Sequence, residues 1–258
     1  MRYPAYKKDI KVIYNLGNLG SPIMDSVMAA FSAPLFQYNV IGTQLHAGVV
    51  RTKSSTDKVF VDWGDGSAQQ EFAGTSDQAY SKGYDSSGNR TVRIFGSDQT
   101  VLTRWTMTTA GANVGGRLVI PSGMTYFLCT GSNTFSGALS IPSGMTYFSC
   151  SGNNTLSGAL SIPSGMTSFL CSGNNTLSDW SWPVIANNQS RFNFVPVGAG
   201  GFTSARVDAL LMLLDTAGGT WATLKEIRLT GTCQPRTSAS DQAVASLVAK
   251  GVTVTTTL

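Results

Sequence analysis

Apolar and polar positions repeat with a fixed long period in the middle of this chain. Residues 116–178 hold three nearly identical units of 21 residues, which begin at Gly116, Gly137 and Gly158. Such a period is typical of a solenoid, in which each unit buries its apolar positions by stacking on its neighbours. The pattern therefore predicts a solenoid, and it favours a structural or interaction protein over an enzyme.

Each unit contains two short strand-like alternations and a turn. Phe148 and Cys150 lie two residues apart, so both point to one face of a strand. Leu139 and Ile141 form the second alternation, which Pro-Ser-Gly at 142–144 closes with turn chemistry. The constant apolar positions are Met124/Met145/Met166, Phe127/Phe148/Phe169, Cys129/Cys150/Cys171 and Phe135/Leu156/Leu177.

The spacing M-x-x-F-x-C-x-x-N/S-N-x-L resembles the leucine-rich repeat, and in particular the short Cys-containing variants of bacterial surface proteins. Met and Phe replace Leu, and the Asn corner is one residue longer. Degenerate units with similar spacing flank the three clear ones, at 102–107, 192–194 and 224–229. The resemblance implies a leucine-rich-repeat-like solenoid over residues 99–202.

The cysteines and asparagines of the repeats have structural interpretations. In-register stacking would place Cys129, Cys150 and Cys171 on one inward ladder, where we expect them to act as small apolar filler. Their spacing does not suit a tetrahedral metal site, and side chains that lean the same way do not form disulfides. Cys233 is expected at an equivalent inward position. The Asn corners are expected to bond backbone groups of the next coil.

Outward positions of the repeat strands are the candidate binding residues. Tyr126, Tyr147, Leu128 and Leu170 are expected on one face together with several hydroxyl side chains. Tyrosine offers a large rigid area and a hydroxyl, and a row of exposed apolar side chains is typical of a partner surface. Two interpretations stay open: contact with a receptor or glycan, and packing against a sister subunit or the N-terminal domain.

Residues 47–98 have the rhythm of a β-sandwich. Val61-Asp62-Trp63-Gly64-Asp65-Gly66-Ser67, followed by Tyr84-x-x-x-Gly88-x-x-x-Val92, resembles the PKD (polycystic kidney disease) family. That resemblance implies an immunoglobulin-like spacer or adhesive module without catalysis, although Arg90 occupies the position of a second family tyrosine. Asp62 and Asp65 are expected to cap the turn, with Ca²⁺ binding as the alternative. His46, the only histidine, is expected on the surface.

Helical patterns lie on both sides of the β-rich region. Residues 21–33 predict a short helix within an N-terminal attachment segment, 1–46. Helices are also predicted at 203–216 and 238–250, with strands at 224–229 and at Val252 and Val254. We expect residues 203–258 to form an α/β cap over the open end of the solenoid. This closing stretch resembles the ends of repeat proteins in Bacteroidetes and their phages.

Composition narrows the function classes. Charged residues make up 12% of the chain, against roughly 25% in an average soluble domain. The net charge of +4 is scattered, which argues against nucleic-acid binding, and no apolar run is long enough to predict a membrane span. No nucleophile motif, phosphate loop or paired carboxylates are evident, so neither catalysis, a cofactor nor a bound metal is expected.

The fold class expected is mainly β: a PKD-like or immunoglobulin-like sandwich, then the solenoid, then the α/β cap. The function expected is a non-enzymatic structural or adhesive protein of a phage virion, in a tail or head fibre or as surface decoration. The start MRYPAYKKDI lacks a signal-like apolar core, which favours a virion over an exported protein. The alternative is a bacterial cell-surface adhesin. Expected partners are other virion proteins, further copies of the chain, or a host receptor or glycan.

Overall fold

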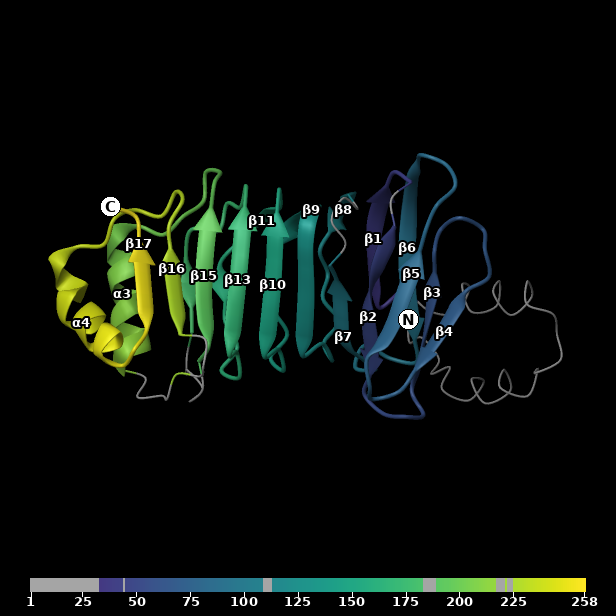
Figure 1. Cartoon of the computed structure of the whole chain (residues 1–258), viewed down its shortest axis with the longest axis horizontal. Coiled ribbons are helices and arrows are strands. Elements are labelled where there is room, and N and C mark those ends of the chain that lie inside the picture. The colour runs from purple at the N-terminus through teal and green to yellow at the C-terminus, as the bar shows by residue number, and fades with distance from the viewer. Residues whose placement is uncertain (1–32, 44, 109–112, 183–188, 217–220, 222–224) are drawn as a thin grey trace, which may run out of the picture.

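The computed structural model describes residues 33–43, 45–108, 113–182, 189–216, 221 and 225–258. The fold is mainly β, with 44% strand and 12% helix, and residues 104–196 form a β-solenoid of about four turns. Of the predicted helix at 21–33, residues 21–32 lie outside the described residues, and Ala33 is not helical. In Figure 1 the strands follow one another along the long axis, and the helices lie at the C-terminal end.

Two sheet layers run along the molecule. The front layer contains, in spatial order, β5 (Gln78–Lys82), β2 (His46–Thr52), β7 (Leu102–Met107), the first half of β9 (Tyr126–Ala138), β10 (Tyr147–Gly152), β13 (Ser168–Gly173), β15 (Arg191–Pro196), β16 (Glu226–Leu229) and β17 (Thr253–Thr256). The back layer contains β4 (Gln70–Ala73), β3 (Lys58–Asp62), β6 (Asn89–Gly96), β1 (Phe36–Ile41), β8 (Asn113–Arg117), the second half of β9 and β11 (Thr155–Ser157).

Strand β9 belongs to both layers because it turns at Gly131. This glycine has φ of 112°, a conformation that side chains with a Cβ rarely adopt. Residues 126–129 pair with β7 and β10, whereas residues 133–138 pair with β8 and β11. Pairing is antiparallel among β1–β6 and becomes parallel at β7–β9 and β8–β9. The N-terminal strands and the solenoid are therefore hydrogen-bonded into the same layers.

A stacked aromatic column fills the core beneath the front layer. Trp105, Phe127, Phe148, Phe169 and Phe192 are buried, and successive ring centroids are 5.1–5.6 Å apart. These residues occupy equivalent positions in neighbouring coils, as the period of 21 residues and its degenerate flanking units predict. The periodic pattern thus specifies a continuous core.

Buried polar ladders hold the coils at their corners. The carboxamide oxygen of Asn154 accepts the backbone N–H of Phe135 at 2.9 Å, and Asn175 accepts that of Leu156 at 3.1 Å. The corner asparagines do bond backbone groups of another coil, but the prediction of the next coil is wrong, because both bonds reach the buried backbone of the preceding coil. Cys129, Cys150 and Cys171 are buried, which confirms the inward ladder. Burial raises the pKa of Cys129 and Cys171 to about 12, so these thiols stay protonated.

Threonines form a second ladder at the start of each front-layer strand. Thr125 donates both its backbone N–H and its hydroxyl to the carbonyl of Thr103, at 2.8 and 3.0 Å. Thr146 repeats both bonds to Thr125, and Thr167 repeats them to Thr146. Thr103 in turn donates its hydroxyl to the carbonyl of Arg51 in β2. The ladder therefore continues from the antiparallel strands into the repeats.

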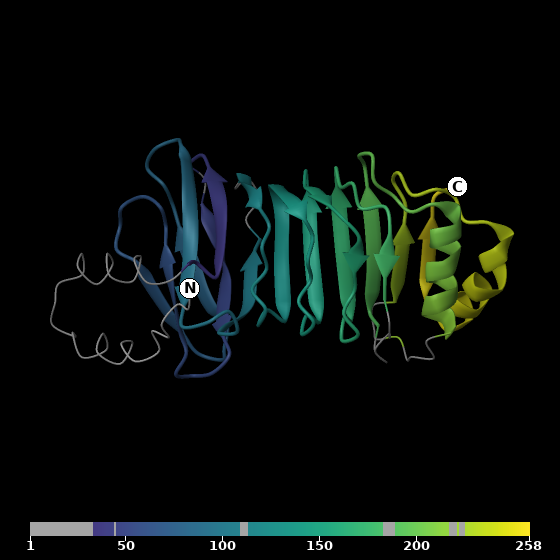
Figure 2. The same ribbon diagram turned by 180° about the vertical axis from the view of Figure 1, so that it is seen from behind.

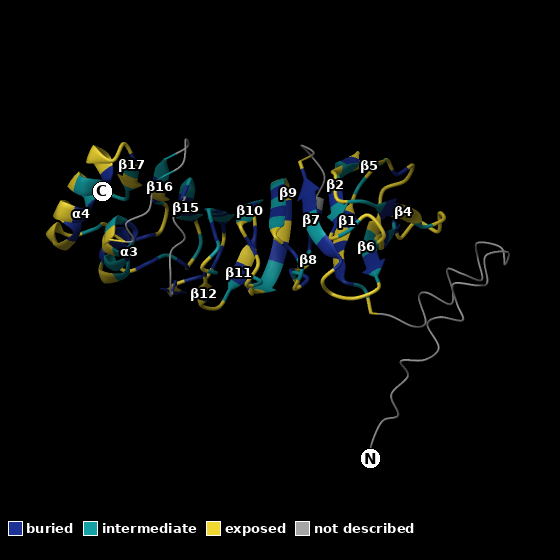
Figure 3. Ribbon diagram, turned by 90° about the horizontal axis from the view of Figure 1, so that it is seen from below, coloured by how far each residue is buried: buried dark blue, intermediate teal, exposed yellow. Residues whose placement is uncertain are grey.

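The remaining elements complete the coils and the C-terminal end. They are β12 (Leu160–Ser161), β14 (Trp180–Ser181), α3 (Ser204–Thr216), η1 (Ser238–Ser240) and α4 (Asp241–Ala249). The two helices predicted at 203–216 and 238–250 are confirmed by α3 and by η1 with α4. Seen from behind, α3 lies over the last front-layer strands and runs along their direction (Figure 2). Figure 3 shows exposed residues on α4 and on the loops around β4.

Candidate functional site

The four candidate binding residues lie together on the outer face of the front layer. Tyr126 and Leu128 are in β9, Tyr147 is in β10 and Leu170 is in β13, and each is half-buried. Tyr126 is opposite Tyr147 in the strand register, while Leu128 and Leu170 flank the buried Ser149. We call these four residues the tyrosine strip.

The two tyrosines are held in one defined arrangement. Their rings stack with centroids 4.2 Å apart and an angle of 7° between the ring planes. The guanidinium carbon of Arg104 lies 3.8 Å from the centroid of Tyr126, on the row that the strand pairing defines. Arg104, Tyr126 and Tyr147 thus form an outer column alongside the buried aromatic column. Partial burial, with a smaller effect of Tyr147, raises the pKa of Tyr126, so its hydroxyl is protonated at neutral pH.

Charged residues border the strip at its N-terminal side. The carboxylate of Asp77 accepts hydrogen bonds from Arg51, with Nε at 2.8 Å, and lies 3.5 Å from Nε of Arg104. Two guanidinium groups share one carboxylate here. This border therefore carries a net positive charge next to the exposed edge of a tyrosine.

The opposite border is electrically balanced. Nε of Arg191 lies 3.0 Å from the carboxylate of Glu226, which also accepts a hydrogen bond from Asn193 at 3.1 Å. Ser168 occupies the tyrosine row between Tyr147 and Arg191 and is buried. The tyrosine row therefore runs from a cationic border through two aromatic rings to a neutral polar border.

Sequence reasoning missed both borders, although a signal for them exists. Arg104 precedes Trp105 in the sequence as Tyr126 precedes Phe127, and Arg191 precedes Phe192 in the same way. Extending the alignment of outward positions to the degenerate units would have placed both arginines in the tyrosine row. Asp77 has no such signal, because it lies on a loop that only the tertiary fold brings to Arg51.

The prediction that His46 lies on the surface is wrong. His46 is buried in β2 among Tyr38, Trp63 and Tyr80, and its Nε2 lies 3.2 Å from the Tyr38 hydroxyl. Its Nδ1 has no hydrogen-bond partner among the described residues. Burial lowers the pKa of His46 from 6.5 to about 4, so the imidazole is neutral at pH 7. The sequence around His46 did not indicate which face of the strand its side chain occupies.

The carboxylates of the Asp62–Ser67 turn bond within their own surroundings. Asp62 accepts the N–H of Gly64 at 2.9 Å, and Asp65 accepts the N–H and the hydroxyl of Ser67. Asp65 also lies 2.7 Å from the ammonium of Lys82. These contacts favour turn capping. Across the described residues, no three His, Cys, Asp or Glu side chains converge in a way that could hold a metal ion.

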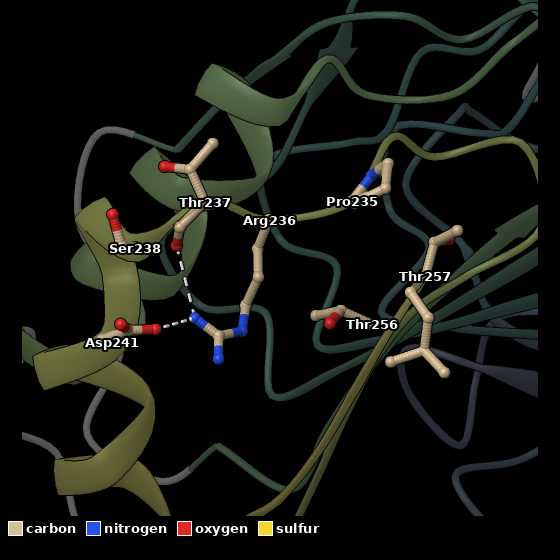
Figure 4. Close-up of a pocket in the computed structure, with 8 residues that line it drawn as sticks. Pro235, Arg236, Thr237, Ser238, Asp241, Thr256 and Thr257 are labelled. Atoms are coloured by element: carbon tan, nitrogen blue, oxygen red, sulfur yellow. Dashed lines mark hydrogen bonds and ion pairs between the residues drawn. The ribbon is translucent and has the colours of Figure 1, made fainter.

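A hollow of about 280 Å³ lies beside the C-terminal end of β17 (Figure 4). Arg236, Thr237 and Asp241 line one side, and Thr256 and Thr257 line the other. Nη1 of Arg236 donates to the carbonyl of Thr237 at 3.3 Å and pairs with Asp241. Because this cation is already paired, the hollow presents less free recognition chemistry than the strip.

No family model, curated protein or solved structure matches the chain. Among the helices of the described ranges, none has the length and apolar character that crossing a bilayer demands. The site combines aromatic area, hydroxyl groups and a cationic border on one face of a sheet.

Proposed function

We propose that this chain is a non-enzymatic structural and adhesive protein of a phage virion, as part of a tail or head fibre or as surface decoration. In this proposal the tyrosine strip contacts the partner, which is a host-surface receptor or glycan, another virion protein or a further copy of the chain. The observation that carries it is the stacked, half-exposed column of Arg104, Tyr126 and Tyr147.

Three physical features support a binding role for this column. Tyr and Arg are the side chains that most often dominate binding energy at protein interfaces. Stacking fixes the rings before a partner arrives, which lowers the entropy lost on association. The strands that carry them are tied by the threonine ladder and the buried aromatic column. The strip is therefore a preorganised surface.

The proposal also assigns the flanking regions. The antiparallel strands before the solenoid are proposed to be a PKD-like spacer. The hydroxyl of Tyr84 donates a hydrogen bond to the carbonyl of Trp63 at 3.1 Å, and this bond joins the DWGDG turn to the second PKD-like motif. The repeats are proposed to be leucine-rich-repeat-like, and α3 to β17 to be the cap. Neither assignment includes a catalytic role.

A double substitution tests the binding role. Tyr126→Ala with Tyr147→Ala removes the rings while leaving the buried column intact, and we expect binding to host cells to weaken by about tenfold or more. Thr155→Ala with Ser178→Ala is the matched control, because both residues are exposed away from the strip. Wild-type binding by a folded double tyrosine variant would show that the strip is not the surface that contacts the host.

The location of the protein distinguishes a virion component from the alternative, a bacterial surface adhesin. The tyrosine strip does not distinguish them, because it could serve either role. Mass spectrometry of purified particles and of cell-envelope fractions from the source culture would quantify the peptides of the chain. We expect stoichiometric amounts in particles. Detection in envelopes alone would replace the virion proposal with the adhesin.

A further inference from the structure

The front layer ends in two strands that each have a single partner. Among the described residues β17 pairs only with β16, and β5 pairs only with β2. These edges are the two ends of one hydrogen-bonded layer, and Figure 1 shows them toward opposite ends of the molecule. An edge strand presents unpaired backbone N–H and C=O groups, which can pair with another chain.

Both edges lack the side chains that usually discourage such pairing. Thr253 and Thr255 are the exposed side chains of β17, which contains no charged residue or proline. In β5 the exposed side chains are Ala79 and Ser81. Lys82 of β5 is engaged by Asp65 at 2.7 Å. Charged residues and proline on an edge are the common protection against edge-to-edge association.

The edge of the back layer differs in this respect. Its last strand, β4, carries Glu71, which pairs with Lys58 of β3 at 2.6 Å, and both side chains are about half exposed. A second copy approaching this edge would meet charged groups. The exposed ion pair on β4 therefore protects that edge better than the side chains of β5 and β17 protect theirs.

The two edge strands also match in direction and in alternation. β5 is antiparallel to β2, β2 is antiparallel to β7, and β7 is parallel to the solenoid strands, so β5 and β17 run the same way. If β17 of one copy pairs with β5 of another so that Val254 lies opposite Tyr80, the two inward side chains meet. In the same register Thr255 lies opposite Ser81 on the outer face. The contact would be parallel, like the pairings within the solenoid.

Helix α4 lies at the same end of the molecule as the β17 edge. It projects beyond β17 along the long axis in both views of the molecule (Figures 1 and 2). Val248 on this helix is 55% exposed, although its neighbour Leu247 is fully buried. Val248 therefore adds an exposed apolar side chain at the C-terminal end of the molecule.

We propose that copies of this chain associate head to tail, with β17 of one copy pairing in parallel with β5 of the next. The two surfaces are different parts of the molecule, so the contact is heterologous and leads to linear chains rather than a closed dimer. This inference is independent of the binding role of the tyrosine strip, which remains on the outer face of each copy.

Sedimentation velocity and negative-stain electron microscopy over a dilution series test the proposal. Wild-type protein should form linear oligomers whose mean length grows with concentration. The variant Thr255→Lys/Ser81→Lys places like charges across every contact and should weaken association by about tenfold. Thr255→Glu/Ser81→Lys places opposite charges there and should associate to within about threefold of wild type.

Two controls keep the result interpretable. Ser151→Lys adds a charge to the outer face in mid-layer, away from both edges, and should associate like wild type. Thermal unfolding of each variant verifies that the fold is kept. A wild-type monomer at every concentration, a closed dimer, or equal association of the like-charge and opposite-charge variants would each overturn the proposal.

Discussion

The repeats and the N-terminal antiparallel strands share the same two layers, yet different contacts hold them. In the repeats each interaction recurs from coil to coil, and residues 119–178 contain no charged side chain. The N-terminal strands rely on contacts that occur once, such as the His46 cluster and the ion pairs of Asp65 and Asp77. The stability of the repeats therefore depends on contacts that recur in every coil, whereas that of the N-terminal strands depends on individual side chains.

The largest expected effect comes from a charge in the cysteine ladder. Cys150→Asp would bury a carboxylate between Cys129 and Cys171, where the described residues supply no cation. We expect a loss of more than about 4 kcal/mol in the free energy of unfolding. Urea unfolding measures it, with Cys150→Ala as the control for the lost side chain. A midpoint equal to wild type would contradict the inward ladder.

Acid should destabilise the fold through the buried histidine of the N-terminal strands. Burial lowers the pKa of His46 to about 4, whereas its value in the unfolded chain is near 6.5. At neutral pH the imidazole is uncharged in both states and does not alter stability. As pH falls below 6.5 the unfolded chain takes up the proton first, so stability declines by about 3 kcal/mol by the time pH reaches the folded pKa.

Chemical unfolding between pH 7 and pH 4 measures this dependence. The variant His46→Phe keeps an aromatic ring at the site and removes its titration, so its profile should be flatter than that of wild type over this interval. Superimposable pH profiles would show that His46 titrates alike in the folded and unfolded chains.

Removing one rung of the asparagine ladder should have a smaller effect. Asn154→Ala leaves the buried N–H of Phe135 without its acceptor, and we expect a loss of about 2 kcal/mol. The equivalent Asn153→Ala, one residue earlier and exposed, should change stability by less than about 0.5 kcal/mol. Equal losses at the two positions would mean that the corner bonds do not stabilise the coil.

The structural features that repeat from coil to coil could be predicted from the sequence. The period located the inward Phe and Cys columns, the corner asparagines and the degenerate strands at Trp105, Phe192 and Ile227, because stacking forces equivalent residues into equivalent places. It also placed the residues of the tyrosine strip on one face. The two C-terminal helices were predicted at the places where they occur, because the signals of a helix are local.

Features that occur once could not be predicted in the same way. The inward position of His46 depends on the register of β2 with β5 and β7, which no local pattern states. The approach of Asp77 to Arg51 and the shared strand β9 likewise arise from long-range pairing. Leu224, predicted to open the 224–229 unit, lies outside the described residues.

Hydrogen exchange of the front-layer amides most directly tests the central claim that the antiparallel strands and the repeats form one continuous layer. Strands β7, β9 and β10 should show similar protection, because pairing runs without interruption from β2 through β7 to the repeats. Cooperative opening at a single free energy is the result expected for such a unit. Fast exchange of the β7 amides beside protected β9 and β10 would show that the layer ends at the first repeat.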